Sequence, residues 1–326
     1  SEPIKTLTNN QFRILAVNCG EKDGVLSVKI DFPEARMYHF MQTTMRQGQA
    51  ADGEGFQVLQ RAIEDAYKRF IQPAVEREVR QTLTQGAQAQ AIQVFGQNLY
   101  HLLMQAPLKG QVVMGFDPGF RTGSKLAIID AQGKFLKKQV IYPHKPANAQ
   151  QRADAAKIFK TLVTTFNVQL VAIGNGTASR ESEEFVAANL PQGVKYAIVN
   201  EAGASVYSAS DAARQEFPDL HVEERSAISI GRRIQDPLAE LIKIDPKSVG
   251  VGQYQHDLNT KALDEQVDAV VETAVNQVGV NLNTASAALL THIAGLNQTL
   301  AQNIVAYREA NGEFKSRVAL KKVPRL

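Results

Sequence analysis

One aspartate stands out as a residue that could do chemistry. Asp117 closes the apolar run VVMGFD and is followed at once by the glycine-punctuated stretch PGFRTGSK. A carboxylate at the end of a buried strand can bind a divalent cation, lie beside a phosphate-binding turn, or simply shape the turn. Which of these three roles Asp117 has depends on the residues that lie near it in the fold.

Three further oxygen-bearing side chains lie where a metal site would need them. Asn175 and Glu201 follow two later strand-like runs, and Asp236 stands at a break in a late helix. Phosphodiester cleavage by two magnesium ions needs three or four carboxylates that converge on ions about 4 Å apart. Asn175 brings an amide and no negative charge, so the four residues fit a vestigial cleft better than a working one. If the cleft is active, the metal ligands are Asp117, Glu201 and Asp236.

Two of these acids also have a purely structural interpretation. Asp236 precedes Pro237, a pattern typical of a helix N-cap followed by its first turn. Glu201 precedes Ala202-Gly203 and could cap the helix expected from residue 205. Both interpretations stay open at the level of sequence.

The stretch after Asp117 fails as a P-loop. Three residues separate Gly119 from Gly123, where a P-loop has four, and Ser124 precedes Lys125. The stretch also resembles the first phosphate loop of actin-like and sugar kinases. A second phosphate loop should then follow, and GNGTAS at 174–179 is the nearest candidate, although a helix-start turn explains it equally. A kinase-like ATPase is therefore kept as the third alternative.

The elements that would position these residues follow one another in an informative order. The expected strands are 111–117, 124–130, 134–142, 168–173 and 194–199, and the expected helices are 148–166, 180–189, 205–216 and 226–243. Three antiparallel strands followed by alternating helices and strands make a mixed sheet with helices on both faces. This is the order of the ribonuclease H-like fold, and ligands of such sheets lie beyond the carboxyl ends of the strands.

The residues before 109 indicate a helical scaffold. Residues 12–32 predict two short strands around a turn at Asp23-Gly24. Apolar residues at helical spacing then run through 56–104, where Pro73 interrupts or starts a helix. No catalytic pattern is visible in this part of the sequence.

The C-terminal segment predicts a helix-hairpin-helix unit. Helical patterns at 281–293, with a start signal at Asn283-Thr284, and at 298–312 flank the tight loop AGLN, and FKSRVALKKVPRL begins a second copy with Pro324 in its loop. Backbone N–H groups of such loops can bind a DNA or RNA phosphate. The candidate nucleic-acid contacts are Gly295, Asn297, Lys315, Arg317, Lys321 and Lys322.

Charge supports a phosphate partner only through its distribution. The net charge of +3 is too small to indicate nucleic-acid binding by itself. Residues 301–326, however, hold six Lys or Arg against two acids, which gives this end a basic surface. A solvated helix face is the competing explanation.

Composition bounds the compartment and the class of protein. The 326 residues suffice for two or three domains, and 44% hydrophobic with 21% charged residues is ordinary for a globular protein. No apolar run is long enough to span a membrane, and the start SEPIKTLTNN lacks a signal peptide. The single Cys19 fits a reducing cytoplasm. Both ends suggest a fragment of a longer protein.

Several stretches together resemble one known family. They are GFDPGFRTGSKLAIID, AIGNGTASRE, VNEAGASVYSAS, RRIQDPLAELIKIDPKSVGVGQYQHD and NLNTASAALL, and they are similar to the Tex family of bacterial transcription accessory proteins over essentially the whole chain. The resemblance implies a YqgF-type ribonuclease H-like domain, related to RuvC resolvases, followed by a helix-hairpin-helix domain. It also implies association with nucleic acid and transcription, and a YqgF domain that does not cleave.

These observations set the expectations for the structure. The fold class is multidomain α/β plus α, with a helical scaffold at 1–108, a ribonuclease H-like mixed sheet at 109–245 and a connector with tandem helix-hairpin-helix units at 246–326. The expected function is sequence-independent binding of nucleic acid, with the transcription machinery as a further partner. A magnesium-dependent, structure-selective nuclease is the alternative. No cofactor is expected, apart from Mg²⁺ if the cleft is active.

Overall fold

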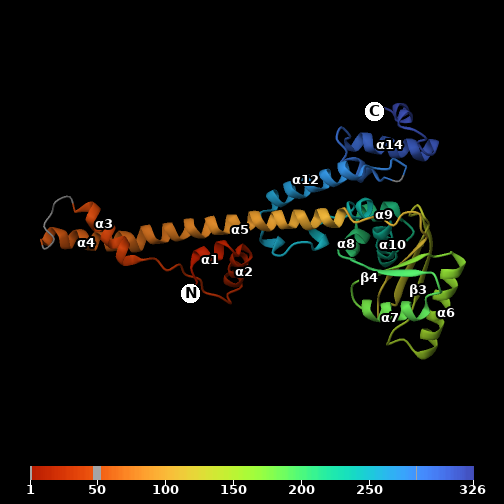
Figure 1. Ribbon diagram of the computed structural model, residues 1–326, viewed down its shortest axis with the longest axis horizontal. Helices are drawn as coiled ribbons and strands as arrows, with labels where there is room; N and C mark the ends of the chain where they lie inside the picture. Colours follow the sequence, from red (N-terminus) through yellow and green to blue (C-terminus); the bar gives the residue numbers. More distant parts are fainter. Residues whose placement is uncertain (1, 47–52, 284) are drawn as a thin grey trace. The chain divides into compact units, whose positions relative to one another are not determined.

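The chain forms two compact units. The computed structural model describes residues 2–46, 53–283 and 285–326 (Figure 1). The first unit comprises residues 1–94 and 252–263, and the second comprises residues 95–251 and 264–326, which include every candidate site residue. Among the described helices, none has both the length and the apolar character that crossing a bilayer requires.

The first unit is built from helices. They are α1 (Ile4–Thr8), α2 (Gln11–Lys22), α3 (Glu34–Met45), α4 (Glu54–Ala66), a π-helical turn (Tyr67–Ile71) and α5 (Gln72–Leu103), which continues into the second unit. Pro73 lies in the first turn of α5, directly after the π-helical turn, where a continuous helix changes from the π to the α pattern of hydrogen bonds. The helices predicted within 56–104 are therefore present, and α5 runs on through Gly86.

The prediction of two strands in residues 12–32 is wrong, because α2 occupies the first part of that range. The Asp-Gly signal marks the end of this helix. Gly24 has a φ of +71°, its N–H donates to the Glu21 carbonyl at 3.0 Å, and the Val25 N–H donates to the Gly20 carbonyl at 2.9 Å. This pair of bonds is the Schellman motif that closes a helix. A short apolar run without alternation does not distinguish strand from helix, which explains the error.

The second unit contains the predicted mixed sheet. Its strands are β1 (Val113–Asp117), β2 (Ser124–Ile129), β3 (Phe135–Ile141), β4 (Leu170–Gly174) and β5 (Lys195–Val199), in the spatial order β3-β2-β1-β4-β5. The pairs β3–β2 and β2–β1 are antiparallel, whereas β1–β4 and β4–β5 are parallel. Parallel strands end at one edge of a sheet, so the tips of β1, β4 and β5 lie together.

The helices of the second unit follow the sequence prediction in most places. They are α6 (Ala149–Thr165), α7 (Ser179–Asn189), α8 (Ala204–Ala209), α9 (Asp211–Glu216), α10 (Val222–Gln235), α11 (Pro237–Leu241), α12 (Thr260–Val278), which begins in the first unit, α13 (Ala287–Leu290) and α14 (Gln298–Asn311), with short 3₁₀ helices at Pro246–Val249, Gln255–Asp257 and Arg317–Lys322.

Two helix predictions need correction. The helix expected at 205–216 is split, because the Ser210 hydroxyl accepts the Ala213 N–H at 3.2 Å and caps a new helix. The helix expected at 281–293 is only Ala287–Leu290, and its N-cap is Ser286. The predicted start signal at Asn283-Thr284 is not the cap, and Thr284 lies outside the described residues.

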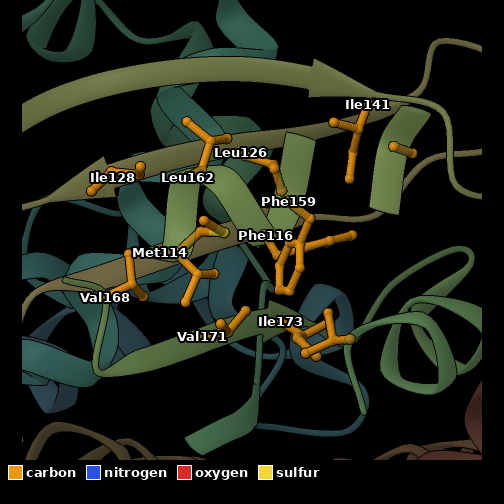
Figure 2. Close-up of a cluster of buried hydrophobic side chains, with 13 residues drawn as sticks. Met114, Phe116, Leu126, Ile128, Ile141, Phe159, Leu162, Val168, Val171 and Ile173 are labelled. Atoms are coloured by element: carbon orange, nitrogen blue, oxygen red, sulfur yellow. The ribbon is translucent and has the colours of Figure 1, made fainter. Parts of the chain in front are cut away.

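Each face of the sheet has its own core. On one face α6 and α7 cover the strands, and Figure 2 shows Phe159 and Leu162 of α6 among Met114 and Phe116 of β1 and Ile173 of β4. On the other face α10 packs against β1, β2 and β4 through Ala227, Ile228 and Ile230. Burial of these two apolar surfaces holds the strand tips in place.

Helix α10 lies unusually close to β1. A Cβ at Gly115 would overlap the carbonyl oxygen of Ala227, and a Cβ at Gly231 would lie 3.3 Å from the Gly115 nitrogen. The missing side chains let the two backbones approach, which fixes the position of α10 along the strand. As a result the first turn of α10 lies beside the carboxyl end of β1.

Candidate functional site

Asp117 lies at the tip of β1, half-buried between β2 and α10. Its Cα partner across the antiparallel pair is Lys125, and its carboxyl is hydrogen-bonded to Ser226 of α10. Burial raises the pKa of Asp117 to about 6, and the negative charge of Glu201 adds to the rise, while the Ser226 hydrogen bond opposes it. The predicted carboxylate is thus close to other acids in a poorly solvated place.

Asn175 and Glu201 meet at the same edge. Asn175 directly follows β4, and its Oδ1 accepts the backbone N–H of Glu201 at 3.0 Å. The Glu201 carboxylate lies over the chain beside β4, since a Cβ at Gly174 or at Gly176 would overlap it. Within the described chain, Glu201 Oε2 is buried and has no hydrogen-bond partner. The structure therefore brings Asp117, Asn175 and Glu201 together, as the sequence predicted.

Asp236 does not join them. Its carboxylate accepts the Ala239 N–H at 3.1 Å and caps α11, which is the structural role that the sequence left open. The preceding residue, Gln235, donates to the carbonyl of Gln111 at 2.8 Å, at the opposite end of β1 from Asp117. The 14 residues of α10 lie between the two edges, a length of about 20 Å. Asp236 is therefore separated from the cleft by the length of that helix.

The charges that α10 does bring to the cleft come from its first turn. Glu223 lies there, and its Oε2 is 2.8 Å from the Nζ of Lys125. Lys125 is only 7% exposed and also donates to the hydroxyl of Thr122. The sequence did not predict this ion pair, because Lys125 was considered only as the lysine of a possible P-loop. The ion pair depends on the direction of α10, which its close packing on Gly115 sets and which brings Glu223 to the carboxyl end of β1.

The residues present do not fit a pair of magnesium ions. Asn175 already uses its amide oxygen to hold Glu201, Asp236 is absent from the cleft, and a lysine lies beside Asp117. In the part of the chain that the structure describes, no group of three His, Cys, Asp or Glu side chains is arranged to hold a metal ion. Two-metal catalysis needs such a convergence of carboxylates.

The geometry is equally unfavourable for a second phosphate loop. The candidate GNGTAS turn has the Glu201 carboxylate lying over Gly174 and Gly176. A carboxylate in that place repels a phosphate. In the first loop, the Gly119 N–H points to the Ser124 hydroxyl at 3.4 Å, inside the loop itself.

The C-terminal hairpin presents backbone donors to solvent. Between α13 and α14, Gly295 has a φ of +86° in a turn closed by the Leu296 N–H and the Ile293 carbonyl at 3.0 Å, and the loop is exposed. Asn297 caps α14 by accepting the Leu300 N–H at 2.9 Å. Among the described residues, the amides of Gly295, Gln298 and Thr299 meet no acceptor.

A second copy of this turn follows. The Leu326 N–H donates to the Val323 carbonyl at 3.3 Å, and Arg325 has a φ of +65°, matching Gly295 in position and conformation. The Asn303 side chain of α14 donates to the Pro324 carbonyl at 3.0 Å and holds the second turn. A non-glycine residue in the left-handed region is uncommon, so the arginine adopts this conformation at some energetic cost.

Four cations flank the two turns. Lys315, Arg317, Lys321 and Lys322 are all exposed. Across the ranges that the structure describes, no carboxylate pairs with any of them. We call Gly295, Arg325 and these four residues the hairpin surface.

Comparison with known sequences identifies both the sheet domain and the C-terminal hairpins. Residues 111–235 match the family model described as the Tex protein YqgF-like domain, and residues 275–326 match the helix-hairpin-helix motif. The transcriptional accessory protein Tex of Neisseria gonorrhoeae is 45% identical over 335 residues, covering 100% of this chain and 43% of that protein. The chain belongs to the Tex family.

Other relatives extend the similarity beyond that protein. An uncharacterised protein of Bacillus subtilis is 53% identical over 328 residues, covering 100% of this chain and 45% of the relative. The S1 RNA-binding domain-containing protein 1 of Homo sapiens is 45% identical over 330 residues, covering 98% of this chain and 33% of the relative. The chain thus spans less than half the length of these relatives.

Proposed function

We propose that this Tex-family chain binds the phosphate backbone of nucleic acid through the hairpin surface, without reading the base sequence. The observation that carries the proposal is the repeated turn, with Gly295 and Arg325 in the same left-handed position and exposed cations nearby in the sequence. Unpaired amides and cations are the donors that a phosphate needs. The ribonuclease H-like domain then acts as a platform that does not cleave.

The charges of the hairpin surface suit this role because they are free to release counterions. A lysine that meets a phosphate displaces a condensed cation, so affinity falls steeply with salt. The cleft of the ribonuclease H-like domain offers no such surface, since its carboxylates repel a phosphate and its lysine is already paired with Glu223.

The test is a salt-dependent binding assay with the double variant Lys321→Glu, Lys322→Glu. We expect affinity for RNA and for DNA to fall at least tenfold at low salt, and the slope of log K against log salt to drop by about 2, because two phosphate contacts are lost. Both losses should be the same for unrelated sequences. Unchanged affinity would refute the assignment.

The matched control makes the same charge change elsewhere. Lys157 and Lys160 are exposed on α6, far in sequence from the hairpins. The variant Lys157→Glu, Lys160→Glu should bind like the unmodified chain. A loss equal to that of the hairpin variant would mean that net charge alone governs binding.

The alternative function is magnesium-dependent cleavage of branched nucleic acid. The convergence of Asp117 and Glu201 at the strand tips is the observation in its favour. Incubation with branched DNA, single-stranded DNA and RNA in Mg²⁺ or Mn²⁺ separates the two proposals. We expect no cleavage; cleavage that Asp117→Asn abolishes would establish the nuclease.

A role in transcription follows from the family and from the names of its members, one of which is called a transcriptional accessory protein and another an S1 RNA-binding domain-containing protein. We infer that the chain acts as the nucleic-acid-binding part of such a factor, in the cytoplasm. Co-purification with RNA polymerase that depends on the hairpin surface would support it, and association that survives the double charge reversal would count against it.

A further inference from the structure

We propose that the Lys125 ammonium occupies the place that the ribonuclease H-like fold gives to a divalent cation, and thereby keeps the cleft from binding one. The proposal concerns the cleft alone. Binding of nucleic acid by the hairpin surface does not depend on it, so the two can fail separately.

The position of Lys125 follows from strand pairing. It is the direct partner of Asp117 across β1 and β2, and directly opposed side chains of an antiparallel pair share a face of the sheet with Cβ atoms about 5 Å apart. From there its Nζ reaches Glu223 at 2.8 Å in the first turn of α10. The buried ammonium therefore lies against the first turn of α10, close enough to Asp117 to oppose the rise in the pKa of that carboxyl.

A second internal cation stands behind Glu201. Arg233 of α10 is 4% exposed, and its Nη1 donates to the carbonyls of Asn200 at 2.6 Å and of Ala202 at 2.8 Å, the two residues that flank Glu201. The acids of the cleft thus have protein cations beside them, one from β2 and one from α10. A metal pair would have to enter against both positive charges.

Displacing Lys125 is costly for an entering ion. The Lys125 side chain is 9% exposed, so moving its ammonium away from Glu223 would separate a buried cation from its partner. The ion would also gain few ligands, because the Asn175 oxygen is engaged with the Glu201 backbone. Removal of the ammonium, in contrast, would release Glu223, whose side chain is 56% exposed, to turn toward Asp117.

The test is a Mn²⁺ titration of the 326-residue chain, in which electron paramagnetic resonance measures the concentration of free ion. We expect the unmodified chain to show no site that depends on Asp117. Lys125→Met, which keeps the apolar stem and removes the charge, should bind one Mn²⁺ at least tenfold more tightly. Adding Asp117→Asn to that variant should abolish the gain.

The structure offers a matched control on the neighbouring strand. Lys138 of β3 also bridges to the first turn of α10, with its Nζ 2.8 Å from Glu224 Oε2, but it does not face Asp117 across β1. Lys138→Met should leave Mn²⁺ binding unchanged. An equal gain in this variant would mean that any lost charge suffices and would overturn the proposal.

Two other results would overturn it as well. One is Asp117-dependent Mn²⁺ binding by the unmodified chain, and the other is a Lys125→Met variant that binds no better than the unmodified chain. If that variant does not fold, Lys125→Gln carries the same titration, with a neutral polar group in the same place.

Discussion

The cleft and the hairpin surface use charge in opposite ways. In the cleft, Lys125 is paired with Glu223 and half-buried acids lie beside protein cations. On the hairpin surface, Lys321, Lys322 and their neighbours are exposed, and the described chain offers them no carboxylate. Charges that the fold neutralises serve the structure, whereas charges left to solvent are free for a partner. The difference supports the proposal that the hairpin surface, and not the cleft, binds nucleic acid.

The comparison predicts that changes at the cleft alter stability and changes at the hairpin surface alter binding. The pKa of Asp117 supports this division for the cleft, because burial raises it and its ionisation is therefore coupled to folding.

Gly115→Ala should be the most damaging single change. Its Cβ would overlap the Ala227 carbonyl, so α10 must move away from β1 and lose its packing there, at a cost of about 3 kcal/mol. Urea denaturation measures the loss. Gly86→Ala is the control, because a Cβ in that exposed helical position meets nothing within 4 Å and should stabilise slightly. Equal effects would show that α10 does not rest on β1 as described.

Asp117→Asn should stabilise the chain at neutral pH. Because burial raises the pKa of Asp117 to about 6, from an ordinary value near 4, the folded state holds a proton that the unfolded state has lost. Stability therefore falls as pH rises from about 4 to 6, and the ionised carboxyl costs on the order of 2 to 3 kcal/mol at pH 7. The variant should lose this pH dependence in thermal denaturation.

The control for that experiment is Asp154→Asn on the exposed surface of α6. It should leave both the midpoint and the pH profile unchanged. If Asp117→Asn behaves in the same way, the carboxyl of Asp117 is solvated and the cleft is more open than described.

Arg325→Gly should have the smallest effect and separates conformation from charge. Glycine adopts a φ of +65° freely, so stability should stay constant or rise by up to about 1 kcal/mol. Affinity for RNA at low salt should fall about threefold through the lost phosphate contact. Arg325→Lys keeps the charge and should retain most of the binding. Retained affinity in Arg325→Gly would remove this residue from the hairpin surface.

The sequence predicted the sheet and most of the cleft for a definite reason. Alternating or continuous apolar runs bounded by glycine turns identified all five strands, and the tips of parallel strands must share an edge. Asp117 ends one such strand, Asn175 directly follows another, and Glu201 lies two residues beyond a third, so their meeting required no knowledge of packing.

The failures lie where a local signal has two structural uses. Asp23-Gly24 is read as a hairpin turn from the sequence, yet the same pair closes α2, because helix ends and hairpins both need a left-handed glycine. Asp236 beside a helix break is equally suited to a cap and to a ligand. For Asp236, the course of α10 along β1 decides between the two uses, because it carries this residue to the edge of the sheet opposite Asp117.

The sequence by itself therefore determined which elements form, which strand tips carry acids, and that a glycine turn between helices is present near a basic end. Tertiary structure alone decided that Lys125 meets Glu223, that Asp236 lies at the far edge, and that Arg325 repeats the conformation of Gly295. The physical reason is that strand order follows from local pattern and chain connectivity. The direction and depth of a packed helix depend instead on contacts between residues such as Gly115 and Ala227, far apart in the sequence.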